Sequence, residues 1–391
     1  MAKILWLSGE YLLPADSGLY RYSLDMLNAL REMGHKVRAI GRARSADDSQ
    51  NADDDGTWTI LPHRNVPMWK KMAHPAPVKV TEVWDRDYAD AVQEALASYD
   101  PDIVLLDHLR VGAALDVIDG TVPSIYVSQN DETHVKEKMI PAAKGIRKAA
   151  LFVDLKKMER FENNLLSRCD GVSAISIADI DTFQARNPKG PIVHTLPSYR
   201  GTRRPERTIT KETPRRVAMI STLYWGAKID NMVMALRGLK PLIDDGTEVV
   251  VFTGGYPPPD EVSRQYPKVR FEGYVDDFDK ALADCRVGIV FEPVGGGFKM
   301  KTLDFIFHRV PLVTGHTSAM SLPLIPGKSV EEVRSETELA PLISSMLDDL
   351  DRLNDLQNTA FETCRDLFTS ESARPLSNLV KAITSGTEKP K

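Results

Sequence analysis

The stretch EPVGGGFKMKTLDF, residues 292–305, gathers residue types that together can bind a phosphorylated ligand. Glycine lacks a Cβ, so three glycines in a row let the backbone adopt positive φ and approach a ligand closely. A helix is predicted over 298–307, and its first turn would offer unpaired N–H groups and a partial positive charge to an anion. The candidate ligand-binding residues are Gly295, Gly296, Gly297, Phe298, Lys299, Lys301 and Asp304.

The spacing of the charged side chains indicates what this ligand is. Lys301 and Asp304 are three residues apart and share a helical face, whereas Lys299 points elsewhere unless it precedes the regular helix. A lysine beside amide donors suits a diphosphate, and a carboxylate one turn deeper suits the paired hydroxyls of a ribose. The implied ligand is a nucleotide diphosphate. The alternative is a glycine-rich turn between strand and helix with two solvated lysines, but the position directly after a buried strand favours phosphate binding.

Short apolar runs alternate with amphipathic stretches along the whole chain, which is typical of parallel sheets covered by helices on both faces. In the first half we predict helices over 19–33, 81–97 and 150–168, and strands over 3–8, 36–40, 102–107, 124–128 and 171–176. In the second half we predict a helix near 229–244 and strands over 216–221, 248–254, 268–273, 286–293 and 310–315, with mainly helical structure after about residue 335.

The length of 391 residues is too great for one ordinary core, and a polar, basic stretch at 199–216 interrupts the alternation. We therefore predict an α/β protein with two doubly wound Rossmann-like domains that face a cleft. The predicted parts are an N-terminal domain (1–200), a linker (201–216), a C-terminal nucleotide-binding domain (217–370) and a final helix (371–391) that in one alternative crosses back to the first domain. Such domains bind ligands beyond the carboxyl ends of their strands.

Composition and charge exclude several classes of protein. The net charge of −5 argues against a general nucleic-acid binder, and no apolar run approaches the roughly 20 residues that span a bilayer. The first residues lack the pattern of a signal peptide. Three widely spaced cysteines form neither a disulfide framework nor a metal-binding motif, so we expect a cytoplasmic location.

Two segments of the first half interleave basic residues with large apolar ones. They are VPMWKKMAHPAPVKV (66–80) and KEKMIPAAKGIRKAALFVDLKKMERFE (136–162). One interpretation is peripheral contact with the anionic inner face of a membrane. The other is an amphipathic helix that packs on the sheet and leaves a charged face in water.

Several stretches resemble, in the same order, parts of the GT-B glycosyltransferases of family four. GGGFKMKTLDFIFHRVPLV resembles the nucleotide-sugar segment of that family, and PADSGLYRYSLDMLNALREMGHKVRAI resembles its opening loop, first helix and second strand. Further resemblances lie in CDGVSAISIADIDTF, ISTLYWGAKIDNMVMAL and VRFEGYVDDFDKALADCRVGIVFEP, and together they cover most of residues 3–320. The resemblance implies two Rossmann-like domains and the transfer of a sugar from a nucleotide diphosphate.

The resemblance also implies roles for single residues. Asp304 would bind the ribose, with one methylene less reach than the glutamate usual in the family. The first of the two family glutamates falls on Gly296, so backbone amides around Gly297 and Phe298 would take over its contact with the sugar. Lys228 falls where many relatives place a phosphate-binding lysine. The family likeness favours retention of configuration, but inverting exopolysaccharide enzymes also lack the first glutamate, so the stereochemical outcome stays open.

The acceptor side offers a second group of candidates. Asp131, Glu132 and His134 directly follow the strand over 124–128, and an inverting enzyme needs such a group to remove the acceptor proton. Asp131 is the first candidate for this general base, and helix capping is its alternative role. Asp16 and Gly18, in the loop after the first strand, would lie near the transferred sugar or form a plain turn.

The leading hypothesis is a cytoplasmic, hexosyltransferase-like enzyme of polysaccharide or glycoconjugate biosynthesis. It would move a sugar from a UDP- or GDP-sugar to a glycan, lipid-linked or small-molecule acceptor. Lysine and a helix terminus would replace a metal ion, so no metal or other cofactor is expected. The alternatives are an inverting exopolysaccharide-type transferase, a nucleotide-sugar epimerase and a non-catalytic nucleotide-sugar-binding subunit.

Overall fold

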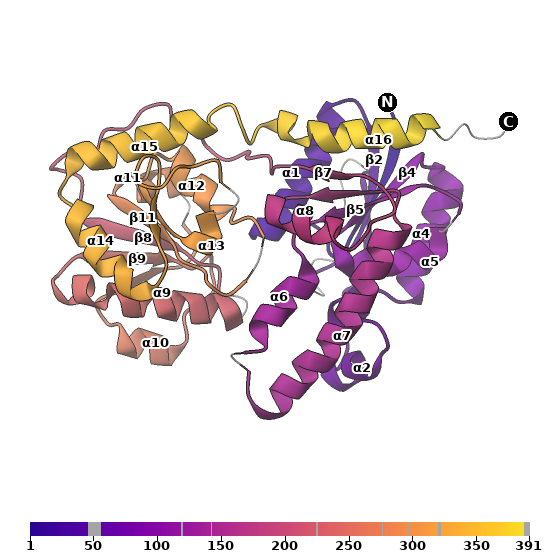
Figure 1. Ribbon diagram of the computed structural model, residues 1–391, viewed down its shortest axis with the longest axis horizontal. Helices are drawn as coiled ribbons and strands as arrows, with labels where there is room; N and C mark the ends of the chain where they lie inside the picture. The colour runs from indigo at the N-terminus through magenta and orange to yellow at the C-terminus, as the bar shows by residue number, and fades with distance from the viewer. Residues whose placement is uncertain are drawn as a thin grey trace. The chain divides into compact units, whose positions relative to one another are not determined.

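The computed structural model describes residues 1–45, 56–118, 120–141, 143–223, 226–275, 277–295, 297–319 and 322–386. The chain divides into two compact units, each an α/β sandwich (Figure 1). The first unit comprises Met1–Ser198, Gly296–Phe298 and Ser370–Lys391, and the second comprises Tyr199–Gly295 and Lys299–Thr369. The prediction of two doubly wound α/β domains is thereby confirmed.

The first unit contains a seven-stranded parallel sheet with the order β3-β2-β1-β4-β5-β6-β7. Its strands are β1 (Lys3–Ser8), β2 (Lys36–Arg42), β3 (Trp58–Leu61), β4 (Ile103–Asp107), β5 (Ser124–Ser128), β6 (Gly171–Ala174) and β7 (Ile192–His194). The strand order reverses between β1 and β4, which is the position where open α/β sheets bind ligands. The edge strands β3 and β7 escaped prediction because they are short and only partly buried.

Helices cover both faces of this sheet. The helices of the first unit are α1 (Gly18–Glu32), α2 (Met68–Ala73), α3 (Val78–Val83), α4 (Arg86–Tyr99), α5 (Leu115–Ile118), α6 (Glu132–Met139), α7 (Gly145–Arg168), α8 (Ile177–Gln184) and α16 (Arg374–Gly386), with 3-10 turns at Leu109–Ala114 and Ser370–Ala373. The helix predicted over 81–97 is wrong in its bounds. The chain is extended at Trp84 and Asp85, which ends α3. The Asp85 side chain accepts a hydrogen bond from the Tyr88 N–H and so caps the start of a separate helix, α4.

Alternate residues of the central strands enter two different apolar clusters, which is why these strands are apolar throughout. Val104 and Leu106 of β4 lie in one cluster, whereas Leu105 lies in the other. Leu376 and Val380 of α16 are fully buried in that second cluster, so the last helix packs on the first unit.

The second unit contains a six-stranded parallel sheet with the order β10-β9-β8-β11-β12-β13. Its strands are β8 (Arg216–Ile220), β9 (Glu248–Phe252), β10 (Arg270–Glu272), β11 (Val287–Val290), β12 (Leu312–Gly315) and β13 (Glu331–Val333). Its helices are α9 (Gly226–Asp244), α10 (Asp260–Gln265), α11 (Phe278–Ala283), α12 (Lys301–Phe307), α13 (His316–Ala319), α14 (Leu339–Met346) and α15 (Leu350–Cys364), with a 3-10 turn at Glu336–Glu338.

Residues 201–216, which the sequence predicts as a linker, lie in the second unit and are tied to it. The Arg207 guanidinium donates to the carbonyl oxygens of Arg309 at 2.6 Å and Ala283 at 2.8 Å. Ile209 is only 1% exposed, and its backbone N–H and C=O both bond to the Asn354 side chain. The polar composition of this segment therefore reflects side chains that satisfy backbone carbonyls.

Candidate functional site

A buried carboxylate surrounded by three lysines lies just beyond the carboxyl end of β11. Glu292, two residues after this strand, is only 5% exposed. The Lys228 Nζ lies 3.0 and 2.9 Å from its two oxygens, and the Lys301 Nζ lies 2.7 Å from Oε1. The Lys299 Nζ is farther away, at 3.7 Å from Oε2. We refer to Glu292, Lys228, Lys299 and Lys301 as the lysine cluster.

Adjacent strands and one asparagine hold this cluster in place. β8 pairs with β11, so their carboxyl ends meet, and the Lys301 Nζ also donates to the Ile220 carbonyl at the end of β8, at 2.6 Å. Lys228 comes from the first turn of α9. One turn later, the Asn231 side chain bonds to both the N–H and the C=O of Val294, at 3.1 and 2.8 Å, and so fixes the chain that leads into the glycines.

The electrostatics of the lysine cluster favour an anion. Burial alone would raise the pKa of Glu292, but the charges of Lys301, Lys228 and Lys299 hold it well below its ordinary value. Burial, together with the like charges of its two neighbours, lowers the pKa of Lys299 to about 8. Burial also lowers the pKa of Lys301. When all three lysines are protonated, three ammonium groups face one carboxylate, which leaves an excess of two positive charges.

The glycine segment has the backbone conformation that its composition predicts. Gly295 has φ of 128° and Gly297 has φ of 67°, a region that other residues rarely adopt. Gly296 lies outside the residues that the structure describes. Gly297 and Phe298 group with the first unit, whereas Gly295 and Lys299 belong to the second.

The helix predicted over 298–307 begins later, at Lys301, so Lys299 precedes the regular helix. Lys301 and Asp304 have different partners, because the Asp304 carboxylate accepts a hydrogen bond from the Tyr199 hydroxyl at 3.0 Å. Asp304 is 6% exposed, and the Tyr199 ring packs on Phe307 with 4.7 Å between centroids. In the free protein, these two predicted ligand-binding side chains therefore hold different hydrogen-bond partners.

Sequence reasoning missed Glu292 as a member of this site. It predicted a strand up to residue 293, which would have made Glu292 part of the sheet, whereas β11 ends at Val290. The available signal was an acidic residue beside a proline at the end of a fully apolar run. A carboxylate in that position rarely stays buried without a cation.

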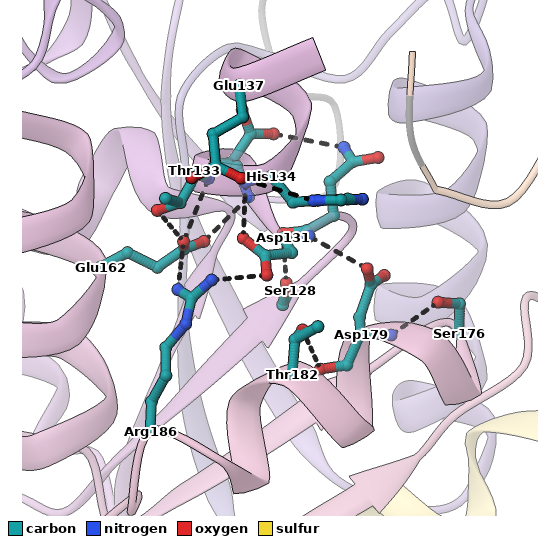
Figure 2. Close-up of polar contacts among 12 residues, drawn as sticks. Ser128, Asp131, Thr133, His134, Glu137, Glu162, Ser176, Asp179, Thr182 and Arg186 are labelled. Atoms are coloured by element: carbon teal, nitrogen blue, oxygen red, sulfur yellow. Dashed lines mark hydrogen bonds and ion pairs between the residues drawn. The ribbon is translucent and has the colours of Figure 1, made fainter. Parts of the chain in front are cut away.

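In the first unit, Asp131 serves as the N-cap of α6 (Figure 2). One carboxylate oxygen accepts the His134 N–H at 2.9 Å, and the other pairs with the Arg186 guanidinium at 2.6 Å. Arg186 also reaches Glu162 of α7 at 2.9 Å. Glu162 in turn accepts the backbone N–H groups of Glu132 and Thr133. These contacts join α6, α7 and the segment after α8.

The two carboxylates that share Arg186 differ in their pKa. For Asp131, burial is outweighed by the His134 N–H and by Arg186, and its pKa is lowered. For Glu162, burial and the charge of Asp131 raise the pKa to about 7. A general base needs an accessible lone pair and a pKa near the working pH. Asp131 has both oxygens engaged and a low pKa, so its geometry favours the capping role.

Glu132 is also engaged. It is 1% exposed, and its carboxylate contacts the His108 Nε2 at 2.8 Å and the ammonium of Lys79. Although burial opposes it, the charges of Lys79 and His108 hold the pKa of Glu132 well below its ordinary value. The side chain of His134 is about half exposed and lies 3.6 Å from Glu137, so it is the accessible member of the three predicted bases.

The loop after β1 carries the remaining two predicted residues. Gly18 is the first residue of α1, and Ser17 before it caps the helix by accepting the Tyr20 N–H. Asp16 is partly exposed and pairs with Arg44 at 2.8 Å. The Arg44 guanidinium lies over the Tyr20 ring, 4.7 Å from its centroid.

Asp131→Asn tests the capping role. Asparagine keeps the cap but loses the buried ion pair with Arg186, so we expect the free energy of unfolding to fall by about 1–3 kcal/mol. Asp116→Asn is the matched control, because Asp116 pairs with Arg168 on the surface. That control should change stability by less than about 0.5 kcal/mol in urea denaturation. Equal stability of the two variants would contradict the assignment.

Comparisons with known proteins address the fold. No protein-family model matches the sequence, and no curated protein matches it either. Solved structures match along the whole chain. Sucrose-phosphate synthase from Thermosynechococcus elongatus has a TM-score of 0.74 at 13% identity, covering 99% of this chain and 100% of that chain. The chain has the GT-B fold.

Two further GT-B structures support this result. TarM has a TM-score of 0.68 at 11% identity, covering 97% of this chain and 99% of that chain. HepE of Anabaena, determined in complex with UDP-glucose, has a TM-score of 0.65 at 14% identity, covering 99% and 100%. The fold expected from the sequence is therefore confirmed. Among the helices that the structure describes, none is both long and apolar enough to cross a membrane.

Proposed function

We propose that this protein is a glycosyltransferase that takes a sugar from a nucleotide diphosphate donor. The lysine cluster carries the proposal: it is a buried site with two excess positive charges at the carboxyl edge of a parallel sheet, where such folds bind ligands. The GT-B fold supports it, because HepE, which shares this fold, has been determined with UDP-glucose and with UDP.

The chemistry of the cluster suits the departure of a nucleoside diphosphate. As the bond to the sugar breaks, negative charge builds on the β-phosphate, and fixed positive groups lower the barrier because they need no reorganisation. Glu292 and the Ile220 carbonyl hold Lys301 in place in advance. In this proposal, the backbone around Gly295, Gly296, Gly297 and Phe298 donates to the phosphates, and Asp304 binds the ribose.

The finer parts of the proposal concern the donor, the acceptor and the stereochemistry. We propose a UDP- or GDP-sugar as donor, a glycan, lipid-linked or small-molecule acceptor, and retention of configuration. Asp16 and Gly18 are proposed to lie near the transferred sugar. If the enzyme inverts, His134 is the predicted base that remains accessible.

Donor turnover with and without acceptors tests the proposal. A transferase consumes UDP- or GDP-sugar and forms a new glycosidic bond only when an acceptor is present. Conversion of the sugar without an acceptor would indicate an epimerase, and an intact donor that nevertheless binds would indicate a binding subunit. Either outcome would contradict transfer.

The dependence of donor affinity on pH is a further expected result. Because a bound diphosphate favours protonated Lys299, whose pKa is about 8 in the free protein, affinity should be nearly constant below that pH and fall above it. Calorimetric titration with UDP between about pH 7 and about pH 9 would measure the slope, which is at most about tenfold per pH unit for one proton. Lys299→Met should bind UDP more weakly at neutral pH and show a shallower slope. An equal slope in both proteins would exclude Lys299 as the titrating group.

A further inference from the structure

Two segments of the first unit contain basic residues and no acidic ones. Residues 62–81 and 138–153 hold no aspartate or glutamate, in a chain whose net charge is −5. The second segment carries four basic residues in sixteen positions: Lys138, Lys144, Arg147 and Lys148. These two segments are therefore locally basic in a protein whose net charge is negative.

The basic side chains of the second segment have no partners within the part of the chain that the structure describes. Lys138, Lys144, Arg147 and Lys148 make no ion pair or side-chain hydrogen bond with any residue that the structure describes. By contrast, Lys71 pairs with Glu82 at 2.8 Å. The four unpaired cations leave a local positive charge that faces solvent or a partner.

Large apolar side chains are exposed among these cations. On α2, Met68 is 61% and Trp69 is 68% exposed, and on the first half of α7, Ile146 is 91% and Phe152 is 53% exposed. Val153 beside Phe152 is 49% exposed. Single exposed apolar residues are common, but several of them beside unpaired basic residues indicate an interaction surface.

Figure 1 draws α2 next to α7, and a lysine of α7 contacts the end of α2. The Lys157 Nζ of α7 donates to the carbonyl oxygens of Met72 and His74 at the end of α2, at 2.6 and 2.7 Å. Asp154 of α7 accepts the Val78 N–H at 2.9 Å and pairs with Lys136. We call α2, Lys144 and residues 145–153 of α7 the α2–α7 surface.

We propose that the α2–α7 surface docks on an anionic lipid bilayer. Aromatic and aliphatic side chains enter the boundary between headgroups and acyl chains, while lysine and arginine attract acidic headgroups. The charge of the surface is complementary to such a membrane, and the opposite charge of the rest of the chain orients the protein with this surface toward it. The inference goes beyond the proposed function and does not depend on it, although bilayer docking would bring a lipid-linked acceptor within reach.

Sedimentation with lipid vesicles tests the proposal on the full-length protein. We expect binding to phosphatidylcholine vesicles that contain roughly 30% phosphatidylglycerol, and at least about tenfold weaker binding to phosphatidylcholine alone. Raising the ionic strength should weaken the interaction, because the Debye length shortens to about 3 Å at 1 M salt. Equal binding to both kinds of vesicle, or to neither, would overturn the proposal.

Matched variants locate the contact. The double variant Arg147→Glu/Lys148→Glu should bind anionic vesicles at least about 100-fold more weakly, whereas Lys381→Glu, on the exposed face of α16, should change binding far less. Trp69→Ser should weaken binding about tenfold, whereas Ile177→Ser, at a side chain that is 61% exposed on α8, should not. Preference for single-stranded RNA or an acidic polypeptide over vesicles would refute the bilayer as the partner.

A second readout separates this proposal from the proposed function. Binding of UDP by the double variant should equal that of the wild type, because none of its changes touches the lysine cluster. Tryptophan emission should shift to shorter wavelength with anionic vesicles, and Trp69→Phe should lose that shift, which assigns it to Trp69 among the five tryptophans. Wild-type protein that binds vesicles without a Trp69 shift would place the contact elsewhere and overturn the assignment.

Discussion

Lys301→Ala should raise the dissociation constant for UDP or GDP by about 10- to 100-fold. The substitution removes a buried ammonium group that touches Glu292 at 2.7 Å, and it halves the excess positive charge of the lysine cluster. A lost hydrogen bond to a charged group accounts for about 1.5–3 kcal/mol, and 2.7 kcal/mol corresponds to about 100-fold in affinity. A nucleotide at 100 times its dissociation constant stabilises a protein by ~2.7 kcal/mol, so the thermal shift seen with the wild type should fall to about half or less in this variant at the same concentration.

Two further variants control this result. Lys328→Ala removes an exposed lysine from the same unit and should leave the thermal shift unchanged. Asp304→Ala should reduce the shift by less than Lys301→Ala does, because it loses the ribose contact of the proposal and not a phosphate contact. If neither Lys301→Ala nor Asp304→Ala alters the shift, the nucleotide binds elsewhere.

Glu292→Gln should destabilise the free protein by about 3–5 kcal/mol, and a nucleoside diphosphate should restore most of that loss. Without the carboxylate, three ammonium groups are left close together in a buried site with no counter-charge. A bound diphosphate supplies the missing negative charge, so UDP should stabilise this variant more than it stabilises the wild type. Urea denaturation with and without saturating UDP measures both effects.

The control for this experiment is another buried carboxylate of the second unit. Glu331 is 8% exposed and pairs with Arg352 at 2.6 Å, so Glu331→Gln should also lower stability. UDP should stabilise that variant only as much as the wild type. If UDP rescues both variants to the same extent, or neither of them, Glu292 is not part of the diphosphate site.

The central strands were predictable because their residues are apolar on both faces. β1 and β5 match the predicted ranges at both ends, and β8 differs by one residue. Strands buried on both sides of a parallel sheet need no alternation, so a continuous apolar run marks them. The edge strands β3, β7 and β13 have only three or four residues, and β3 and β7 are also partly exposed, so such segments look like loops.

Side-chain roles were predictable only where they depend on local geometry. Gly295 and Gly297 have positive φ, as three successive glycines suggest. The sequence left open whether Asp131 is a general base or a helix cap. The ion pair of its carboxylate with Arg186, 55 residues away, favours the capping role. Such a contact depends on how α6, α7 and α8 pack, and no local pattern encodes it.

The amino-acid sequence by itself determined the class of fold and the positive φ of Gly295 and Gly297, and it predicted Lys301 as a phosphate-binding residue. Those properties follow from hydrophobic periodicity and from residue types that lie close together along the chain. Only the tertiary structure decided that Glu292 gathers Lys228 and Lys301, because 64 residues separate Lys228 from Glu292 and the pairing of β8 with β11 closes that distance. A charge cluster built from the ends of different elements exists only once the sheet has formed.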